Sequence, residues 1–469
     1  MGAPVVSALA PARRVALEVI VAATREKRYA REVLDRADAV ARLDARDRGL
    51  CRRLVLGSTA AEGALDELLD TFLSQPRKVS PRVRAALRIA AFEIVYLRTP
   101  AEVAVSQGVE LVRSVARGAA GLANAVLRRV AEGAEGYLLA LDAPLGERER
   151  ISRARRAGLP VWLSDRIDAS LPASVAEALR QSELEPAPVS VHVRPGAAYP
   201  QEGHPSELPG CVLDADAGQI AHSGAFARAE VVASDLHAQL VATAAVSSGT
   251  CLEEGAGRGT KTFIMACQAA RAGYTREHVA VDLYPGKCTA NLERLERAGF
   301  CGVRAFAGDA RDLDAVLAPL GDAAGMLFDT VLVDAPCSGT GTMRRHPEIP
   351  WRLAEADIQP GGSLPALQLS LLTAAAARVR PGGTLLYATC SVLDAENRDV
   401  IEAFLASEQG MAFRLALVSE SPIFSLEAFT GAAKLVRAHE EGDGTFRTAP
   451  APGAYDGHFC ARMVRSCEL

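Results

Sequence analysis

The sequence lacks the features that mark membrane, secreted and metal-binding proteins. It has no run of about 18 uncharged apolar residues, which excludes a membrane-spanning helix. Its start is apolar and then basic, the reverse of a secretory signal peptide, so we expect a cytoplasmic protein. The 10 cysteines have no paired spacing, which indicates free thiols in a reducing compartment. Because no CxxC pair, HExxH motif or Cys/His cluster occurs, we expect no bound metal.

The sequence also lacks a strong excess of positive or negative charge. The formal net charge of −5 does not point to a nucleic-acid partner. However, Lys and Arg exceed Asp and Glu in residues 1–135, whereas acidic residues prevail in the rest. A basic front segment indicates either a domain that meets phosphates or a salt-bridged helical surface, and charge alone leaves both open.

The composition is that of a folded protein with several domains. Hydrophobic residues make up 49% of the 469 residues and charged residues 23%, which argues against long disorder. Apolar residues recur at helical spacing throughout residues 1–135, as at Val15, Val19 and Ala22. This spacing predicts an all-helical domain of about five to seven helices over 1–135.

The pattern of apolar and polar residues changes at two further points, near residues 136 and 236. Residues 136–235 are predicted to form linker helices and a small α/β segment, with short β-like runs at 189–193 and 211–213. Residues 236–469 alternate strand-like runs at 251–254, 279–283, 303–307, 330–333 and 383–388 with helical stretches. This alternation predicts a mainly parallel, doubly wound sheet, in which ligands bind outside the carboxyl ends of the strands.

A glycine-rich turn follows the first of these strands and precedes a helix. Glycines permit a tight turn and a close approach of the backbone to a ligand, and the helix amino end offers free N–H groups. The spacing from Gly255 to Lys261 is too short for a phosphate-binding P-loop. The candidate cofactor-binding residues of the turn are Gly255, Ala256, Gly257, Arg258, Gly259, Thr260 and Lys261.

Three acidic residues follow the next three strands. Asp282, Asp309 and Asp334 each stand at a predicted strand end, and Asp282 is placed to accept the hydroxyls of a ribose. Several fixed carboxylates suit an adenosine that carries a sulfonium and an ammonium better than they suit a polyphosphate. We therefore favour S-adenosyl-L-methionine over a nucleoside triphosphate or NAD as cofactor.

Two cysteines stand in polar loops at the same edge of the sheet. Cys337 lies in Asp334–Gly341 (DAPCSGTG), and Cys390 lies in Tyr387–Ser391 (YATCS). A thiolate is a strong nucleophile when its surroundings lower its pKa. Cys267 and Cys288 fall on predicted helices and are interpreted instead as buried apolar side chains.

These motifs resemble the Sun/RsmB-like (NOL/NOP/Sun) RNA cytosine-5 methyltransferases over nearly the whole chain. DAPCSGTG followed by Arg344–Ile349 (RRHPEI) is similar to the family's fourth motif, and YATCS followed by Val392–Asn397 (VLDAEN) is similar to its sixth. The front segment, with Gly121–Arg129 (GLANAVLRR), resembles the family's NusB-like RNA-binding domain. The resemblance implies a NusB-like helical domain at 1–135 and a Rossmann-like methyltransferase domain at 236–469.

The resemblance also implies catalytic roles. Cys390 is then the nucleophile that adds to carbon-6 of cytosine, and Cys337 acts in product release. Asp334 would hydrogen-bond the exocyclic amine or protonate the ring, and Lys261 would orient the cofactor or the base edge. The target base must leave its stack to reach such a cleft. The predicted RNA-binding residues are Arg344, Arg345, His346, Arg128 and Arg129.

Three features depart from the family pattern. The first motif has Arg258 where the family usually has proline, which puts cofactor affinity in question. Residues 359–363 (QPGGS) interrupt an expected helical continuation, and His458 stands where a phenylalanine is expected before the closing strand.

The resemblance predicts methylation of a cytosine in ribosomal RNA, with 16S RNA or a small-subunit assembly intermediate as partner, by a monomer that binds no membrane. Two alternatives remain open. One is a catalytically weak RNA-binding ribosome assembly factor, for which the Arg258 loop is the only support. The other is a methyltransferase acting on adenine or protein, which a loop of the type Asp-Ala-Pro-Cys does not fit.

Overall fold

The structure of the chain is a computed structural model that describes residues 9–221 and 223–467. It divides the chain into two compact units. The first contains the residues up to Pro186 together with Met343–Leu353, and the second contains Ala187–Thr342 and the residues from Ala354 onward. Within the described ranges, no helix has the length and apolar character needed to cross a membrane.

The described part of the first unit is built from helices. Between Pro11 and Leu138 it forms eight α-helices rather than five to seven, because the extended backbone of Ala37 separates α2 from α3. The helices of the unit are α1 (Pro11–Glu26), α2 (Ala30–Arg36), α3 (Asp38–Ala41), α4 (Ala45–Ala60), α5 (Glu62–Phe72), α6 (Pro81–Val95), α7 (Ala101–Val115), α8 (Ala120–Leu138), α9 (Arg148–Ala157), α10 (Val161–Ser170), α11 (Ala173–Ser182) and the short α18 (Ile349–Arg352).

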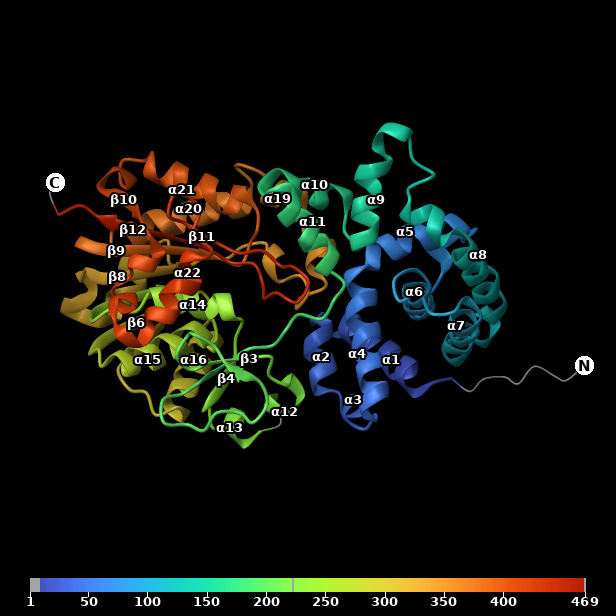
Figure 1. Cartoon of the computed structure of the whole chain (residues 1–469), viewed down its shortest axis with the longest axis horizontal. Helices are drawn as coiled ribbons and strands as arrows, with labels where there is room; N and C mark the ends of the chain where they lie inside the picture. Colours follow the sequence, from blue (N-terminus) through green and yellow to red (C-terminus); the bar gives the residue numbers. More distant parts are fainter. Residues whose placement is uncertain (1–8, 222, 468–469) are drawn as a thin grey trace, which may run out of the picture. The chain divides into compact units, whose positions relative to one another are not determined.

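Helix α6 forms the centre of this unit and packs against α1, α4, α5, α7 and α8 (Figure 1). Ser80 caps its first turn and Pro81 occupies its first position, both of which favour a helix start. Its residues Leu87 and Phe92 are fully buried. Gly57 of α4 makes room for the ring of Phe92, since a Cβ there would lie 2.0 Å from the ring. The core of the unit therefore depends on close helix packing around α6.

Helix α9 is joined to the preceding helices by the side chain of Arg155. Its guanidinium donates to Glu67 of α5 and to Asp142, each at 2.6 Å, and lies 4.2 Å from the ring centroid of Tyr137. Arg155 is only 5% exposed, so these partners compensate the loss of its hydration. Residues 148–182 consequently belong to the helical unit.

The segment Met343–Leu353 also folds with these helices, although it follows the Cys337 loop in sequence. The carboxylate of Glu348 accepts the backbone N–H of Ala30, the first residue of α2. The indole of Trp351 donates to the carbonyl of Ala60 at 2.6 Å, and the ring of His346 lies edge-on to that of Tyr29. These contacts fasten the segment to the ends of α2 and α4.

The second unit begins with a small antiparallel sheet. Its strands β1 (Val191–Val193), β2 (His204–Pro205), β3 (Cys211–Leu213) and β4 (Val231–Ala233) have the order β2-β3-β1-β4, with α12 (Ala217–Ala221) and α13 (Gly224–Ala227) before β4. His192 in β1 hydrogen-bonds Gln239 of α14 (Leu236–Ala244) at 2.8 Å. The small sheet is thus part of the second unit.

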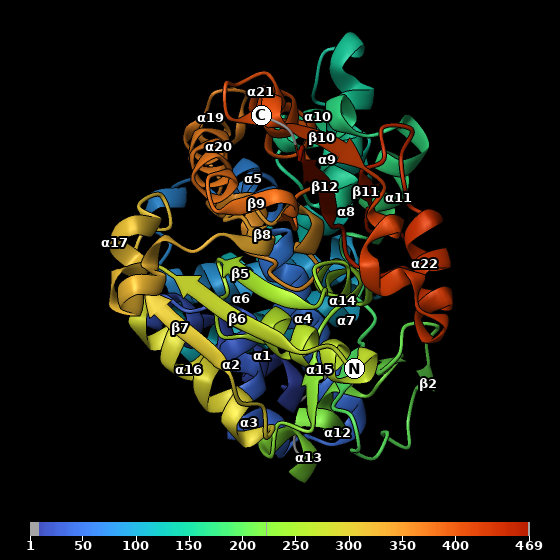
Figure 2. The same ribbon diagram turned by 90° about the vertical axis from the view of Figure 1, so that its left-hand side faces the viewer.

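The large sheet has the order β10-β12-β9-β8-β5-β6-β7, and Figure 2 shows its central strands side by side. The pairs among β5 to β9 are parallel, whereas β12 pairs antiparallel with β9, β10 and β11. This confirms the predicted doubly wound sheet. The strands are β5 (Gly249–Glu254), β6 (Arg276–Asp282), β7 (Val303–Ala307), β8 (Phe328–Asp334), β9 (Val379–Thr389), β10 (Phe413–Ala416), β11 (Phe446–Arg447) and β12 (Phe459–Arg465).

Helices cover both faces of this sheet. Adjacent strand residues point to opposite faces, so Leu385 lies in one hydrophobic core and Leu386 in the other. One core includes α14, α15 (Thr260–Ala272), α16 (Pro285–Arg297) and α22 (Thr430–Arg437); the other includes α17 (Leu313–Leu317), α20 (Ser363–Ala376) and α21 (Arg398–Leu405). The expected interruption at 359–363 is the break between α19 (Glu355–Ile358) and α20, where Gly361 has φ +76°.

The observed units differ from the predicted ranges 1–135, 136–235 and 236–469. No separate middle domain is present in the described residues: 136–186 fold with the helical unit and 187–235 fold with the large sheet. The cause is polar packing, such as that of Arg155, which leaves no periodic signal in the sequence.

Candidate active site

The glycine-rich turn at the end of β5 is tightly packed on two sides. Gly255, Gly257 and Gly259 have φ of +74°, +58° and +79°, which favour glycine. A Cβ on Gly255 would lie 2.2 Å from the carbonyl oxygen of Asp334, and one on Gly259 would lie 1.9 Å from an oxygen of Asn291. At Gly257 the nearest such atom is 3.9 Å away, so the turn forms a cradle that is open at its middle.

The acidic residues predicted at the strand ends lie at the carboxyl edge of the sheet. Asp282 ends β6 and is 6% exposed; its Oδ2 accepts the N–H of Gly257 at 3.0 Å. Asp334 ends β8 beside the turn. Asp309 lies two residues beyond β7, and its carboxylate binds Arg311, whose hydrogen bonds lower its pKa. The sheet thus brings the backbone N–H groups of the turn and the carboxylate of Asp282 together.

Lys261 and Asp334 form a partly buried ion pair. Lys261 Nζ lies 2.7 Å from Asp334 Oδ2. Burial raises the pKa of Asp334 above its ordinary value, although Lys261 partly opposes this. Burial alone would lower the pKa of Lys261, but Asp334 outweighs it and the net shift is upward. The pair therefore holds the Lys261 ammonium against Asp334 at the strand end, and only Oδ2 of that carboxylate contacts the ammonium.

The two candidate cysteines meet at this edge. The Sγ atoms of Cys337 and Cys390 are 3.4 Å apart, and both side chains are partly exposed. The thiol of Cys337 stabilises the Cys390 thiolate, which lowers the pKa of Cys390 despite its burial, and Lys261 lowers it further. Interaction with Cys390, together with burial, raises the pKa of Cys337. Cys390 is thus the thiol that ionises first, as a nucleophile requires.

Glu396 joins the two cysteine loops, a role that sequence reasoning missed. Its carboxylate is fully buried and accepts the N–H of Ser338 at 2.7 Å, the hydroxyls of Ser338 and Ser391, and Gln368 Nε2 at 3.0 Å. Ser338 follows Cys337 and Ser391 follows Cys390. The signal in the sequence was the position of Glu396, an acidic residue in the short stretch Val392–Asn397 directly after the second cysteine motif.

The predicted RNA-binding residues are scattered rather than gathered. Arg128 and Arg129 are exposed on α8. Arg344, Arg345 and His346 belong to the segment that folds with the helical unit. Arg344 is only 5% exposed, so its guanidinium is largely withdrawn from solvent and from a phosphate. The expectation that Arg344 holds phosphates therefore does not fit its burial, whereas RNA contacts by the other four remain predictions.

Two departures from the family pattern leave the site intact. Arg258 is exposed, so its side chain does not enter the turn and the backbone cradle is kept. His458 is 5% exposed, and its N–H donates to Thr448 at 2.9 Å just before β12 begins. Cys267 and Cys288 are buried on α15 and α16, as expected.

Comparison with known proteins decides the family. Residues 241–464 match the family model described as 16S rRNA methyltransferase RsmB/F, and residues 10–132 match the NusB family. The chain is 31% identical to ribosomal RNA small subunit methyltransferase B of Sodalis glossinidius, over 91% of this chain and 92% of that protein. The chain belongs to the RsmB/F family. It is therefore an rRNA methyltransferase by family, with a NusB domain and a Rossmann-like catalytic domain.

Other RsmB/F relatives agree. The chain is 29% identical to the probable ribosomal RNA small subunit methyltransferase B of Bacillus subtilis, over 87% of this chain and 91% of that protein. The crystal structure of PH0851 superposes with a TM-score of 0.69 at 22% identity and covers 99% of both chains, which shows a shared fold.

S-adenosylmethionine, the cofactor of this RsmB/F enzyme, fits the residues at the strand ends. Gly257 leaves the middle of the turn open to a ligand, and the buried carboxylate of Asp282 stands directly beside it. Asp282 is suited to hold the ribose, the turn to face the amino-acid part, and Asp334 to border the reactive end. The cradle and the carboxylates together provide what an adenosine with a positively charged tail requires.

Gly255→Ala is expected to weaken S-adenosylmethionine binding at least about tenfold. The new Cβ would collide with the Asp334 carbonyl, and an alanine at positive φ costs roughly 1–2 kcal/mol. Isothermal titration measures the affinity. Gly286→Ala is the control, because Gly286 lies in the first turn of α16 with open space around its Cβ position. Equal affinities for both variants would show that the turn does not hold the cofactor.

The pH dependence of alkylation is expected to identify the ionised cysteine. Because the pKa of Cys390 is lowered, its reaction with iodoacetamide should rise with pH around a midpoint that lies below that of an ordinary cysteine thiol. Cys337→Ala removes the largest cause of the lowered pKa, so it should move the midpoint upward. The labelled peptide, identified by mass spectrometry, reports the rate. An unchanged midpoint in Cys337→Ala would contradict this assignment.

Proposed function

We propose that this RsmB/F methyltransferase transfers a methyl group to carbon-5 of a cytosine in 16S ribosomal RNA through a covalent bond between Cys390 and the base. The observation that carries the proposal is the pair of thiols at 3.4 Å, of which Cys390 has the lowered pKa. A reaction at an amino nitrogen needs no such nucleophile, whereas carbon-5 of cytosine is unreactive until a nucleophile adds to carbon-6.

The residues of the site supply the steps around methyl transfer. The Cys390 thiolate bonds carbon-6, and the electron pair of the 5,6 double bond moves onto carbon-5, which becomes nucleophilic. The Asp334 carboxylate accepts a hydrogen bond from the exocyclic amine or, in the protonated form that its burial favours, donates one to ring N3, and so stabilises the adduct. Lys261 holds Asp334 in place at 2.7 Å. S-adenosylmethionine, when bound, supplies the methyl group.

Cys337 is suited to the release step. While Cys390 is a thiolate, its negative charge raises the pKa of Cys337. Once Cys390 has bonded carbon, that charge is gone, so Cys337 loses its proton to solvent more readily, and the resulting thiolate can accept the carbon-5 proton. The electrons of the C–H bond restore the 5,6 double bond, and Cys390 leaves as a thiolate. One cysteine thus adds while the other removes the proton.

The substrate is proposed from the family and from the helical unit. The similar proteins of S. glossinidius and B. subtilis carry the name ribosomal RNA small subunit methyltransferase B, with "probable" before it for the latter. Exposed Arg128 and Arg129 on α8 of the NusB domain suit contacts with RNA phosphates. We propose a monomer that acts in the cytoplasm on 16S RNA or on a small-subunit assembly intermediate.

The identity of the methylated base tests the proposal. Wild-type protein is incubated with labelled S-adenosylmethionine and either unmodified 16S RNA, small-subunit precursors or transfer RNA, and each RNA is digested to nucleosides. Label in 5-methylcytosine from 16S RNA or precursors is the expected result. Label in methyladenosine, or only in transfer RNA, would overturn the proposal.

A further inference from the structure

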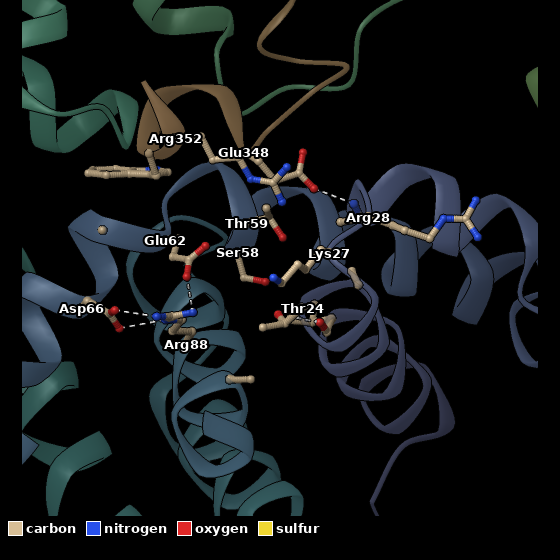
Figure 3. A pocket seen from close by; sticks show the side chains of 16 residues that line it. Thr24, Lys27, Arg28, Ser58, Thr59, Glu62, Asp66, Arg88, Glu348 and Arg352 are labelled. Atoms are coloured by element: carbon tan, nitrogen blue, oxygen red, sulfur yellow. Dashed lines mark hydrogen bonds and ion pairs between the residues drawn. The ribbon is translucent and has the colours of Figure 1, made fainter. Parts of the chain in front are cut away.

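The helical unit contains a cavity of about 600 Å³ that no step of methyl transfer uses. It lies among α1, α4, α5, α6 and the segment Met343–Leu353, all of which belong to this unit (Figure 3). Its volume is in the range of pockets that bind small organic molecules. Polar side chains and one large aromatic ring line it, so it suits a ligand that has both polar groups and a flat ring.

Glu348 lines this cavity, and one of its two carboxylate oxygens has no hydrogen-bond partner among the described residues. Glu348 is 6% exposed, and its Oε1 accepts the N–H of Ala30. Its Oε2 is buried but has no hydrogen-bond partner among the described residues. A buried carboxylate oxygen without a donor is costly, since such groups are almost always hydrogen-bonded. A ligand N–H that reaches this covered oxygen from the cavity would give it the hydrogen bond that it lacks.

The ring of Trp351 forms a fixed flat wall. Its indole N–H donates to Ala60, and the ring rests on Gly63, where a Cβ would lie 2.2 Å from the ring. These two contacts fix both the direction and the depth of the ring, while Trp351 remains partly exposed to the cavity. A planar ring held in this way is a stacking surface for a nucleobase.

Lys27 and Arg352 supply positive charge that no carboxylate of the described chain neutralises by an ion pair. The side chain of Lys27 points into the cavity (Figure 3), and its backbone has φ +53° at the end of α1, a conformation that side chains rarely adopt. The Arg352 guanidinium lies 5.1 Å from the ring centroid of Tyr29. By contrast, Arg88 is held by Glu62 and Asp66.

We propose that this cavity binds one unpaired nucleotide of the RNA substrate whose base carries an exocyclic amine. The base stacks on Trp351 and donates its amine to Glu348 Oε2, while Lys27 and Arg352 hold its phosphate. A basic peptide would be repelled by the two cations and an acidic peptide by Glu348, whereas a nucleotide carries donors on its base and negative charge on its phosphate. The proposal rests on RNA being the substrate.

Tryptophan fluorescence tests this binding directly. The chain has two tryptophans, so the protein carrying Trp162→Phe reports on Trp351 alone. The probes are the single-stranded tetranucleotides r(A)4, r(C)4 and r(U)4. We expect quenching by r(A)4 or r(C)4 with at least about tenfold higher affinity than by r(U)4. Lys27→Ala should weaken all binding about tenfold, and Arg42→Ala, which removes an exposed charge elsewhere in the unit, should not.

Glu348→Gln distinguishes base recognition from simple charge attraction. The glutamine carbonyl can still accept the Ala30 N–H, but an NH₂ donor then replaces Oε2. The preference should reverse toward r(U)4, whose base offers a carbonyl at that position. Thermal unfolding verifies that each variant is folded. No quenching, or equal affinity for all three probes in both wild type and Glu348→Gln, would overturn the proposal.

Failure of this site and failure of the proposed function give different results. If the cavity binds no nucleotide, wild-type protein still forms 5-methylcytosine and the probes leave Trp351 unquenched. If the cytosine reaction is wrong, the probes still bind with the Glu348-dependent preference while no 5-methylcytosine appears. In the methylation assay, Lys27→Ala should raise KM for RNA and leave kcat unchanged, because the site only binds.

Discussion

Replacing Cys390 by alanine is expected to reduce methyl transfer at least about a thousandfold, which corresponds to roughly 4 kcal/mol of lost transition-state stabilisation. The loss follows from the proposed roles, because Cys337, 3.4 Å away, takes the carbon-5 proton and does not add to carbon-6. Single-turnover methylation of 16S RNA with labelled S-adenosylmethionine measures the loss.

Cys337→Ala is the companion variant and should fail differently. The thiolate of Cys390 can still add to the base, but the carbon-5 proton then has no acceptor. A covalent protein–RNA adduct should therefore accumulate and be visible as a slow-moving, label-containing band on a denaturing gel. The double variant should show no adduct.

Cys301→Ala is the matched control, since Cys301 is an exposed thiol in the loop before β7. Its activity should equal that of wild type. If Cys390→Ala keeps its activity while Cys337→Ala loses it without an adduct, then Cys337 is the nucleophile and the proposed roles are exchanged.

Glu396→Ala is expected to have the second-largest effect. It removes the acceptor of the Ser338 N–H, the Ser338 and Ser391 hydroxyls and Gln368 Nε2 in a fully buried place. Leaving these donors unsatisfied should lower the free energy of unfolding by roughly 3–5 kcal/mol. Thermal and urea unfolding of the whole chain measure this change.

Glu396→Gln separates positioning from stability. Its carbonyl keeps part of the network, and the two serine hydroxyls can rotate to accept from its amide. It should therefore remain folded but hold the cysteine loops less well, so that methylation falls more than stability does. Glu420→Gln, a change of the same type on a short helix away from the cysteine loops, is the control. If Glu396→Gln is as active as wild type, the network does not position the cysteines.

The catalytic sheet could be predicted from sequence because its signals are local. The strand predicted at 303–307 has the same first and last residues in the structure. The Asp334–Gly341 and Tyr387–Ser391 motifs identified the two cysteine loops. The turn from Gly255 to Lys261 could be predicted for the same reason, because its glycines mark backbone positions with positive φ. That Cys337 and Cys390 meet followed from the rule that parallel strands end at one edge.

Long-range polar contacts could not be predicted. Trp351 and Ala60 are separated by 291 positions, and only the folded chain shows that Gly63 leaves room for the indole. Likewise, the sequence around Arg155 does not reveal that Glu67 and Asp142 bind it. Such pairs form between polar groups that only the folded chain brings together, so the sequence contains neither a periodic pattern nor a motif that would predict them. The packing of residues 136–186 with the helical unit and the Glu396 network were missed for this reason.

The place of Met343–Leu353 in the helical unit limits how the gene can be divided. The chain passes between its two units at residues 186–187, 342–343 and 353–354, so neither unit is one continuous stretch of the sequence. A catalytic fragment starting at Ala187 would carry Trp351 and Glu348 without Ala60, Gly63 and Ala30. Exchanging the NusB domain between relatives would therefore require this segment to be exchanged with it.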